Sequence, residues 1–429
     1  MDARTATSEE GRDAELDTSG ERVVRVIAVG NRMHIAAKET ECRTELERIV
    51  GLAAPHIASD GPTLVVLGEL LGLPAALAGP RGLLARHARS SRTALTLLAL
   101  AHARRILAYR LRWPGISLAR ALLLALTDAL YRPFLETLSE QARRHGVFLV
   151  ATTLAPRVRR STDPRAIRRW GSPGASAVYL PEGPDVYNAA LVFGPDGALL
   201  GRVNKVNLTH NERETLDLTP GRLAEVRVIS TAAGRLGVAI SLDAFTPDYL
   251  RHLDAQAAEI VVQNDANDAP WAGPGSASDW QPQEWLDSVL GALQPPYRSL
   301  RYNVCAMQTG NFFDLVFDGQ SSITARASTG HGEWASTGRP YEPSRGFIGV
   351  DDYVPTATSG PLLGEFLACA PWVEEDPGIA EPRLTLDQRR RWLAAIAREL
   401  RPGGARVNQY RESVVSADVM VMAEPAAKS

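Results

Sequence analysis

Apolar residues alternate along the chain between short continuous runs and longer stretches with helical spacing. The short runs predict buried strands over residues 23–30, 63–72, 146–154, 188–197, 235–243 and 258–265. The strand pattern continues through 303–311 and 314–325, and amphipathic helices are predicted over 41–59 and 246–256. Strands interleaved with helices predict a layered α/β fold.

Residues 81–140 interrupt this rhythm with a stretch that is rich in Leu, Ala and Arg. The stretch is helical by propensity, and Trp113-Pro114-Gly115 divides it into two predicted amphipathic helices. Three interpretations compete: a helical hairpin that covers the core, a lid or oligomer interface, and an anchor on a membrane surface. We favour packing or an interface over peripheral membrane contact, because composition alone does not distinguish a membrane-bound face from a solvated one.

The remaining segments divide the chain into three parts. We expect a disordered tail over 1–21, one domain over 22–335 that contains the 81–140 insertion, and an extension over 336–429 that packs on the domain or on a partner. Segments 155–185 and 266–298 are predicted to be long loops. The extension contains a predicted helix over 385–401 and a strand-like stretch over 412–424.

Charge and cysteine content exclude several classes of protein. The chain has 47 basic and 49 acidic residues and a formal net charge of −2, which argues against a general nucleic-acid binder. Its 3 cysteines are far apart and form no metal-binding motif, which is typical of a reducing compartment. The first residues lack an apolar signal segment, and no apolar run reaches the roughly 18 residues of a membrane span. We therefore expect a cytoplasmic protein.

Three side chains that could take part in catalysis follow apolar runs. Glu69 follows the run of 63–68, Ser241 follows that of 235–240, and Lys205 comes after a Pro-Asp-Gly turn and a further short strand. The chain has only 3 lysines, so Lys205 stands out among arginines. Sites in layered α/β proteins gather at the carboxyl ends of strands. A carboxylate base, a small nucleophile and a cation for developing negative charge form a set suited to acyl transfer.

The segments that contain these residues resemble the nitrilase superfamily of carbon–nitrogen hydrolases. LVVLGELLGLP, YNAALVFGPDGALLGRVNK and RLGVAISLDAF resemble, in that order, the family's segments with the catalytic glutamate, lysine and nucleophile. The resemblance covers residues 23–75 and 140–330. It implies the four-layer α-β-β-α sandwich of that family and a homodimer or larger homo-oligomer.

The resemblance also implies a role for each site residue. Glu69 would be the general base, and Lys205 together with the backbone N–H of Leu242 would stabilise the oxyanion. The second, supporting glutamate would be Glu212, with Glu214 as a rival. Three further residues follow strand ends or lie in the second long loop and are candidates for substrate contact, with packing roles as the alternative: Asn264, Phe245 and Trp271.

The nucleophile position departs from the family, because Ser241 stands where the family has cysteine. A thiol ionises far more readily than an alcohol, and the glutamate and lysine differ from the histidine that usually activates serine. We favour a deliberate Cys→Ser replacement that leaves an inactive protein, because the change is isosteric and the surrounding residues are intact. A natural pseudo-enzyme and a natural serine nucleophile are the alternatives.

The function implied is hydrolysis of a small amide or nitrile through a thioester, without a metal or organic cofactor. Acyl transfer to an amine and a non-catalytic scaffold are the alternatives.

Overall fold

In the computed structural model, two six-stranded sheets lie face to face. Residues 20–172, 174–268, 271, 281–326, 364–370 and 412–422 are described, together with 388, 391 and 395. The first sheet contains, in spatial order, β16 (Ser413–Met422), β1 (Glu21–Gly30), β2 (Thr63–Leu67), β3 (Phe148–Ala155), β6 (Tyr187–Phe193) and β7 (Leu199–Asn204). The second contains β15 (Gly364–Cys369), β14 (Ser322–Arg326), β11 (Tyr302–Gln308), β10 (Ile260–Ala266), β9 (Gly234–Ile240) and β8 (Ile229–Thr231).

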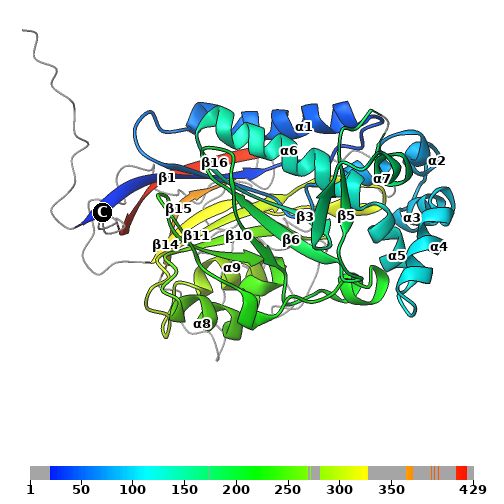
Figure 1. Cartoon of the computed structure of the whole chain (residues 1–429). Coiled ribbons are helices and arrows are strands. Elements are labelled where there is room, and N and C mark those ends of the chain that lie inside the picture. The colour runs from blue at the N-terminus through cyan, green and yellow to red at the C-terminus, as the bar shows by residue number, and fades with distance from the viewer. Residues whose placement is uncertain are drawn as a thin grey trace, which may run out of the picture.

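Helices cover the outer face of each sheet, so the molecule has four layers (Figure 1). The first sheet is covered by α1 (Glu39–Leu52) and α6 (Thr127–His145). The second is covered by α8 (Pro247–Ala255) and α9 (Gln281–Gly291). The predicted α-β-β-α sandwich is confirmed.

Strand β1 is continuously apolar from residue 26 to residue 30, where it is buried on both faces. Val24 and Val26 belong to the core between the two sheets, whereas Ile27 and Val29 belong to the core beneath α1 and α6. Because successive side chains of a strand point to opposite faces, a strand covered on both sides needs apolar residues at every position.

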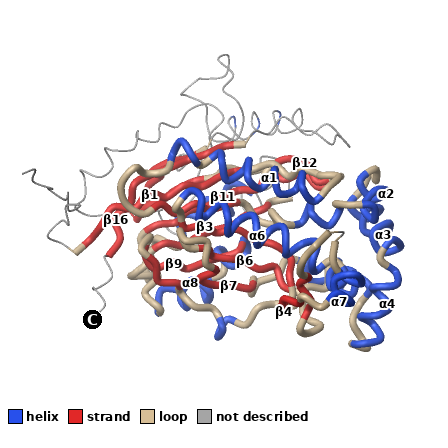
Figure 2. The backbone as a smooth tube through the Cα atoms, turned by 45° about the horizontal axis from the view of Figure 1, so that its top comes forward, coloured by secondary structure: helices blue, strands red, loops and turns tan. Residues whose placement is uncertain are grey.

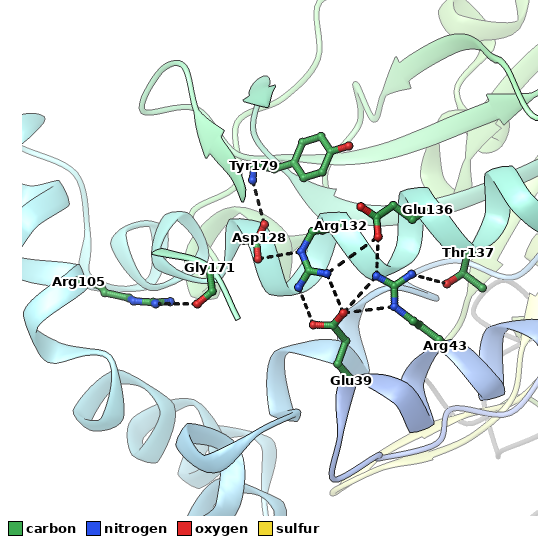
Figure 3. Close-up of polar contacts among 9 residues, drawn as sticks. All are labelled: Glu39, Arg43, Arg105, Asp128, Arg132, Glu136, Thr137, Gly171 and Tyr179. Carbon is green, nitrogen blue, oxygen red and sulfur yellow. Dashed lines mark hydrogen bonds and ion pairs between the residues drawn. The ribbon is translucent and has the colours of Figure 1, made fainter. Parts of the chain in front are cut away.

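A partly buried ionic cluster joins α1 to α6 (Figure 3). Arg132 donates two hydrogen bonds to the carboxylate of Glu39, at 2.8 and 2.6 Å, and one to Asp128 at 3.2 Å. Asp128 also accepts a hydrogen bond from the backbone N–H of Tyr179. This network fixes α6 over the first sheet, so the last part of the 81–140 segment belongs to a core layer.

The rest of that segment forms a lobe of short helices beside the four layers (Figures 1 and 2). The sequence predicted two helices, whereas the lobe contains α2 (Leu83–Arg86), α3 (Ser91–Ala101), α4 (Ala103–Arg112) and α5 (Leu118–Ala125). A hydroxyl cap at Ser90 starts α3 and accounts for the boundary between α2 and α3, and a second cap at Ser117 starts α5 after the predicted break. The predicted break at 113–115 is confirmed.

Smaller elements occupy the predicted loops and the carboxyl-terminal part. The 155–185 segment contains β4 (Val158–Ser161), α7 (Pro164–Trp170) and β5 (Val178–Pro181). A hairpin of β12 (Gly310–Phe312) and β13 (Leu315–Phe317) follows β11. The predicted strand over 412–424 is β16, while the tail over 1–19 and all but three residues of the predicted helix over 385–401 lie outside the described residues. No helix in the described ranges is long and apolar enough to cross a bilayer.

Candidate active site

Glu69 is held where the ends of the two sheets meet. Its backbone N–H donates to the carbonyl of Asp265, and the Asn264 side chain donates to the carbonyl of Leu67 at 2.6 Å. A Cβ on Gly68 would lie 2.9 Å from the backbone nitrogen of Gln308, so only glycine allows this close approach. The end of β2 is thereby fixed against β10 and β11.

Lys205 lies between two glutamates in the interior. Its Nζ atom is 2.8 Å from Oε1 of Glu69 and 2.9 Å from Oε2 of Glu212, and its side chain is 1% exposed. Glu212 comes from a π-helical turn, Asn211–Thr215, a type of distortion that is frequent at functional sites. Glu214, the rival in the sequence, is exposed. Of the two glutamates, Glu212 is the one that reaches Lys205.

Asn188 joins the same cluster and was not identified from the sequence. Its side-chain Nδ2 donates to Glu69 Oε1 at 2.7 Å and to Glu212 Oε1 at 2.8 Å. Its backbone carbonyl accepts a hydrogen bond from the backbone N–H of Lys205. The signal was a polar residue within the apolar run of β6. Asn188 holds both carboxylates and the start of the lysine segment in one arrangement.

The electrostatics of the cluster suit proton transfer. Burial, reinforced by the negative charge of Glu212, raises the pKa of Glu69 to about 8 in spite of Lys205. Burial alone would lower the pKa of Lys205, but the two glutamates raise it above its ordinary value. Burial is likewise outweighed at Glu212, where Lys205 and Asn188 lower the pKa. Lys205 therefore stays charged, and Glu69 can gain and lose a proton near neutral pH.

Ser241 begins a tight turn at the end of β9 and is partly exposed. Its φ of 47° is in the left-handed region, a strained conformation that non-glycine residues adopt mainly at functional sites. Asp243, two residues later, accepts the backbone N–H groups of Val206 and Asn207. This carboxylate therefore ties the turn at Ser241 to the segment that follows Lys205, and burial raises its pKa to about 6.

A further buried carboxylate, Asp265, lies beside the nucleophile position. Its Oδ2 accepts the side-chain amide of Gln263 at 2.7 Å and the thiol of Cys305 at 3.5 Å. Its Oδ1 has no hydrogen-bond partner in the described part of the chain. Burial raises the pKa of Asp265, while the hydrogen bonds from Gln263 and Cys305 and the charge of Lys205 act in the opposite direction. The sequence signal was again a polar residue in a buried strand.

Cys305 is fully buried, and burial together with Asp265 raises the pKa of its thiol well above the ordinary value. Such a thiol is a poor nucleophile, because little of it is ionised near neutral pH.

The three candidates for substrate contact occupy different surroundings. Asn264 is buried and bonded to the backbone of β2. Phe245 is partly buried against the core between the sheets. Trp271 is 1% exposed and packs edge-on against Trp285. Leu242 follows Ser241 in the first part of a helical turn, where backbone N–H groups lack helical partners. Substrate contact by the three and an oxyanion role for Leu242 stay predictions.

Comparisons with known proteins agree with this geometry at the level of family. The carbon–nitrogen hydrolase family model matches residues 111–326. Glu69 lies before the matched range, so its place in the site rests on its contacts with Lys205 and Asn188. No curated protein sequence matches the chain.

Several solved structures are similar in fold at low sequence identity. A double mutant of the amidase from Nesterenkonia sp. AN1 in complex with acrylamide is 15% identical over 73% of this chain and 86% of that chain, with a TM-score of 0.41. A carbon–nitrogen hydrolase from Helicobacter pylori G27 is 15% identical over 71% and 82%, with a TM-score of 0.42. The glutamine-dependent NAD+ synthetase from Acinetobacter baumannii is 16% identical over 70% and 41%, with a TM-score of 0.42.

The family match extends over half of the sequence and includes Lys205, Glu212 and position 241. The chain belongs to the carbon–nitrogen hydrolase family.

Proposed function

We propose that this site is built to hydrolyse the carbon–nitrogen bond of a small amide or nitrile, and that Ser241 leaves the chain with little or no activity. The observation that carries the proposal is the buried arrangement of Lys205 between Glu69 and Glu212, tied through Asp243 to the turn at position 241.

Each group has a defined task in this reaction. A nucleophile at 241 attacks the amide carbon and transfers its proton to Glu69, whose pKa of about 8 suits acceptance and return of a proton. The ammonium of Lys205 and the N–H of Leu242 stabilise the oxyanion that develops. Glu69 then donates this proton to the amide nitrogen, which leaves as ammonia when the carbon–nitrogen bond breaks. Water, deprotonated by Glu69, attacks the acyl group, and the nucleophile takes the proton back from Glu69 as the acid is released.

Serine limits the first step. A thiol with a pKa near 8.5 matches the basicity of Glu69, so the proton is shared readily between them. An alcohol is a far weaker acid, and no described histidine lies among the hydrogen-bonded partners of the cluster to assist it. The same groups around a cysteine would form a complete acyl-transfer site.

The test restores the thiol. Ser241→Cys is assayed against aliphatic and aromatic amides and nitriles for ammonia release, beside Ser241→Ala and the double variant Ser241→Cys/Glu69→Gln. We expect turnover by the cysteine variant alone and an acyl adduct in its intact mass. A correctly folded Ser241→Cys protein with neither turnover nor adduct would contradict the proposal. Product analysis with an added amine separates hydrolysis from acyl transfer.

A further inference from the structure

The helical lobe of α2–α5 exposes an unusual amount of apolar surface. Of the 11 large hydrophobic side chains that are exposed in the described ranges, 6 lie in this lobe: Leu83, Leu84, Leu100, Leu107, Leu111 and Leu118. Leu107 and Leu111 are one turn apart on α4, and Leu111 is 73% exposed. Ile106 and Tyr109 on the same helix are buried, so α4 has apolar residues toward the core and toward solvent.

Three of these leucines, Leu100, Leu107 and Leu118, line a groove between α3, α4 and α5. The groove has a volume of about 860 Å³, and its apolar lining includes Leu95, Leu100, Leu107, Leu118 and Leu122. It extends to Glu214 and Thr215, the last two residues of the π-helical turn, and to Leu216, which follows them. The apolar face is thus continuous with the segment that supplies Glu212.

The charge of the lobe has one sign. Residues 70–127 contain 9 arginines and no aspartate or glutamate, although the whole chain has a net charge of −2. Three of these arginines form hydrogen bonds within the protein. Arg86 donates to the backbone carbonyls of residues 77 and 79, and Arg120 donates to Asp217. Arg105 donates to the backbone carbonyl of Gly171 (Figure 3). The other six are exposed and form no ion pair within the described ranges: Arg81, Arg89, Arg92, Arg104, Arg110 and Arg112.

We propose that the α2–α5 lobe binds the surface of an anionic phospholipid bilayer, with its leucines among the acyl chains and its arginines at the headgroups. Exposed leucines beside unpaired arginines on short helices are the combination that inserts into a membrane interface. The positive charge of the lobe, together with its leucines, favours an anionic bilayer over other partners. A second copy of the same face would bring arginines together without acidic partners, and a nucleic acid would leave the leucines exposed.

The interaction would place the catalytic site beside a membrane. The π-helical turn that supplies Glu212 also contributes Glu214 and Thr215 to the groove, so the bound lobe would bring this side of the site toward the bilayer. The inference itself rests on the lobe and is independent of the activity.

The experiment is co-sedimentation of the full chain with vesicles of phosphatidylcholine alone and of phosphatidylcholine mixed with phosphatidylglycerol. We expect binding to the anionic vesicles only, weakened by added salt. Leu107→Ser/Leu111→Ser and Arg110→Gln/Arg112→Gln are each expected to weaken binding about ten-fold or more. The matched control is Leu199→Ser/Leu200→Ser, which removes two exposed leucines of β7 outside the lobe and is expected to leave binding unchanged.

Circular dichroism and light scattering accompany each variant. Absence of binding to either kind of vesicle overturns the proposal. It is also overturned if the control weakens binding as much as the lobe variants do, or if wild-type protein dimerises in solution and only the lobe variants are monomeric, because the leucines would then cover a second copy.

Discussion

Replacement of Lys205 by methionine is expected to destabilise the fold, and by an amount that depends on pH. The ammonium lies 2.8 Å from Glu69 and 2.9 Å from Glu212, with the lysine side chain 1% exposed. Methionine has a similar length but no charge. The variant therefore keeps two buried carboxylates and loses the cation between them.

The size of the effect follows from these contacts. One contact at 2.8 Å corresponds to about 6 kcal/mol of attraction at an effective dielectric constant of about 20, before the desolvation of the ions is subtracted. Removal of one partner from a buried ion pair costs about 3–5 kcal/mol in net terms. We expect the free energy of unfolding to fall by that amount at about pH 8.

The sign of the pH dependence follows from the carboxylates. Without Lys205, burial raises the folded pKa of Glu69 and Glu212 above the unfolded values of about 4.3. The folded variant then binds more protons than the unfolded chain, so its stability is greatest at low pH and is lost as the pH rises. The cost at about pH 5 is expected to be less than half of that at pH 8.

Urea unfolding followed by tryptophan fluorescence measures both values, with Trp271 and Trp285 as buried reporters. Lys38→Met, at an exposed lysine, is the control and should change stability by about 0.5 kcal/mol or less. The double variant Lys205→Met/Glu69→Gln should recover part of the loss. An equal cost at both pH values, or a cost below about 1 kcal/mol at pH 8, would refute the reasoning.

Three further outcomes are expected. In Ser241→Cys protein, kcat/KM should rise with pH to a plateau above about 8, because Glu69 acts in its deprotonated form and its pKa is about 8; a profile that is flat from pH 6 to 9 would exclude Glu69 as the base. In the same Ser241→Cys protein, Asp265→Asn should shift the rise of kcat/KM to lower pH, because the negative charge of Asp265 helps to raise the pKa of Glu69. An unshifted rise would show that the two groups do not interact. Arg132→Met should lower the free energy of unfolding by about 3–5 kcal/mol in urea melts, because it leaves Asp128 buried without its cation; a change below about 1 kcal/mol would mean that solvent replaces the guanidinium.

The main features of the fold could be predicted from hydrophobic patterning, because central strands such as β2 and β3 are buried on both faces and form continuous apolar runs. The boundaries within 81–140 could not. The assignment of α6 to the layer over the first sheet depends on Arg132 and Glu39, an ion pair across 93 positions that no local pattern shows.

Glu69 and Lys205 could be predicted as site residues, because each follows a segment that reads as a strand from its apolar pattern. The choice between Glu212 and Glu214 was open in the sequence, because either spacing suits the resemblance, and only the course of the π-helical turn separates them. Asn188 and Asp265 were missed because each lies inside an apolar strand, where a polar residue has no partner until the fold is known.

The pairing of β1 with β16 has a consequence for biosynthesis. The two strands run antiparallel over ten residue pairs, from Glu21 with Met422 to Gly30 with Ser413, so the first sheet joins segments that are far apart in the sequence. The loop between the paired residues Arg25 and Asp418 spans 393 positions, and non-local pairing of this kind forms slowly. During synthesis this edge of β1 therefore stays unpaired until residues 413–422 have left the ribosome. A chain truncated before Ser413 would leave that edge of β1 open for pairing with other chains. By covering this edge, β16 also protects the protein against aggregation.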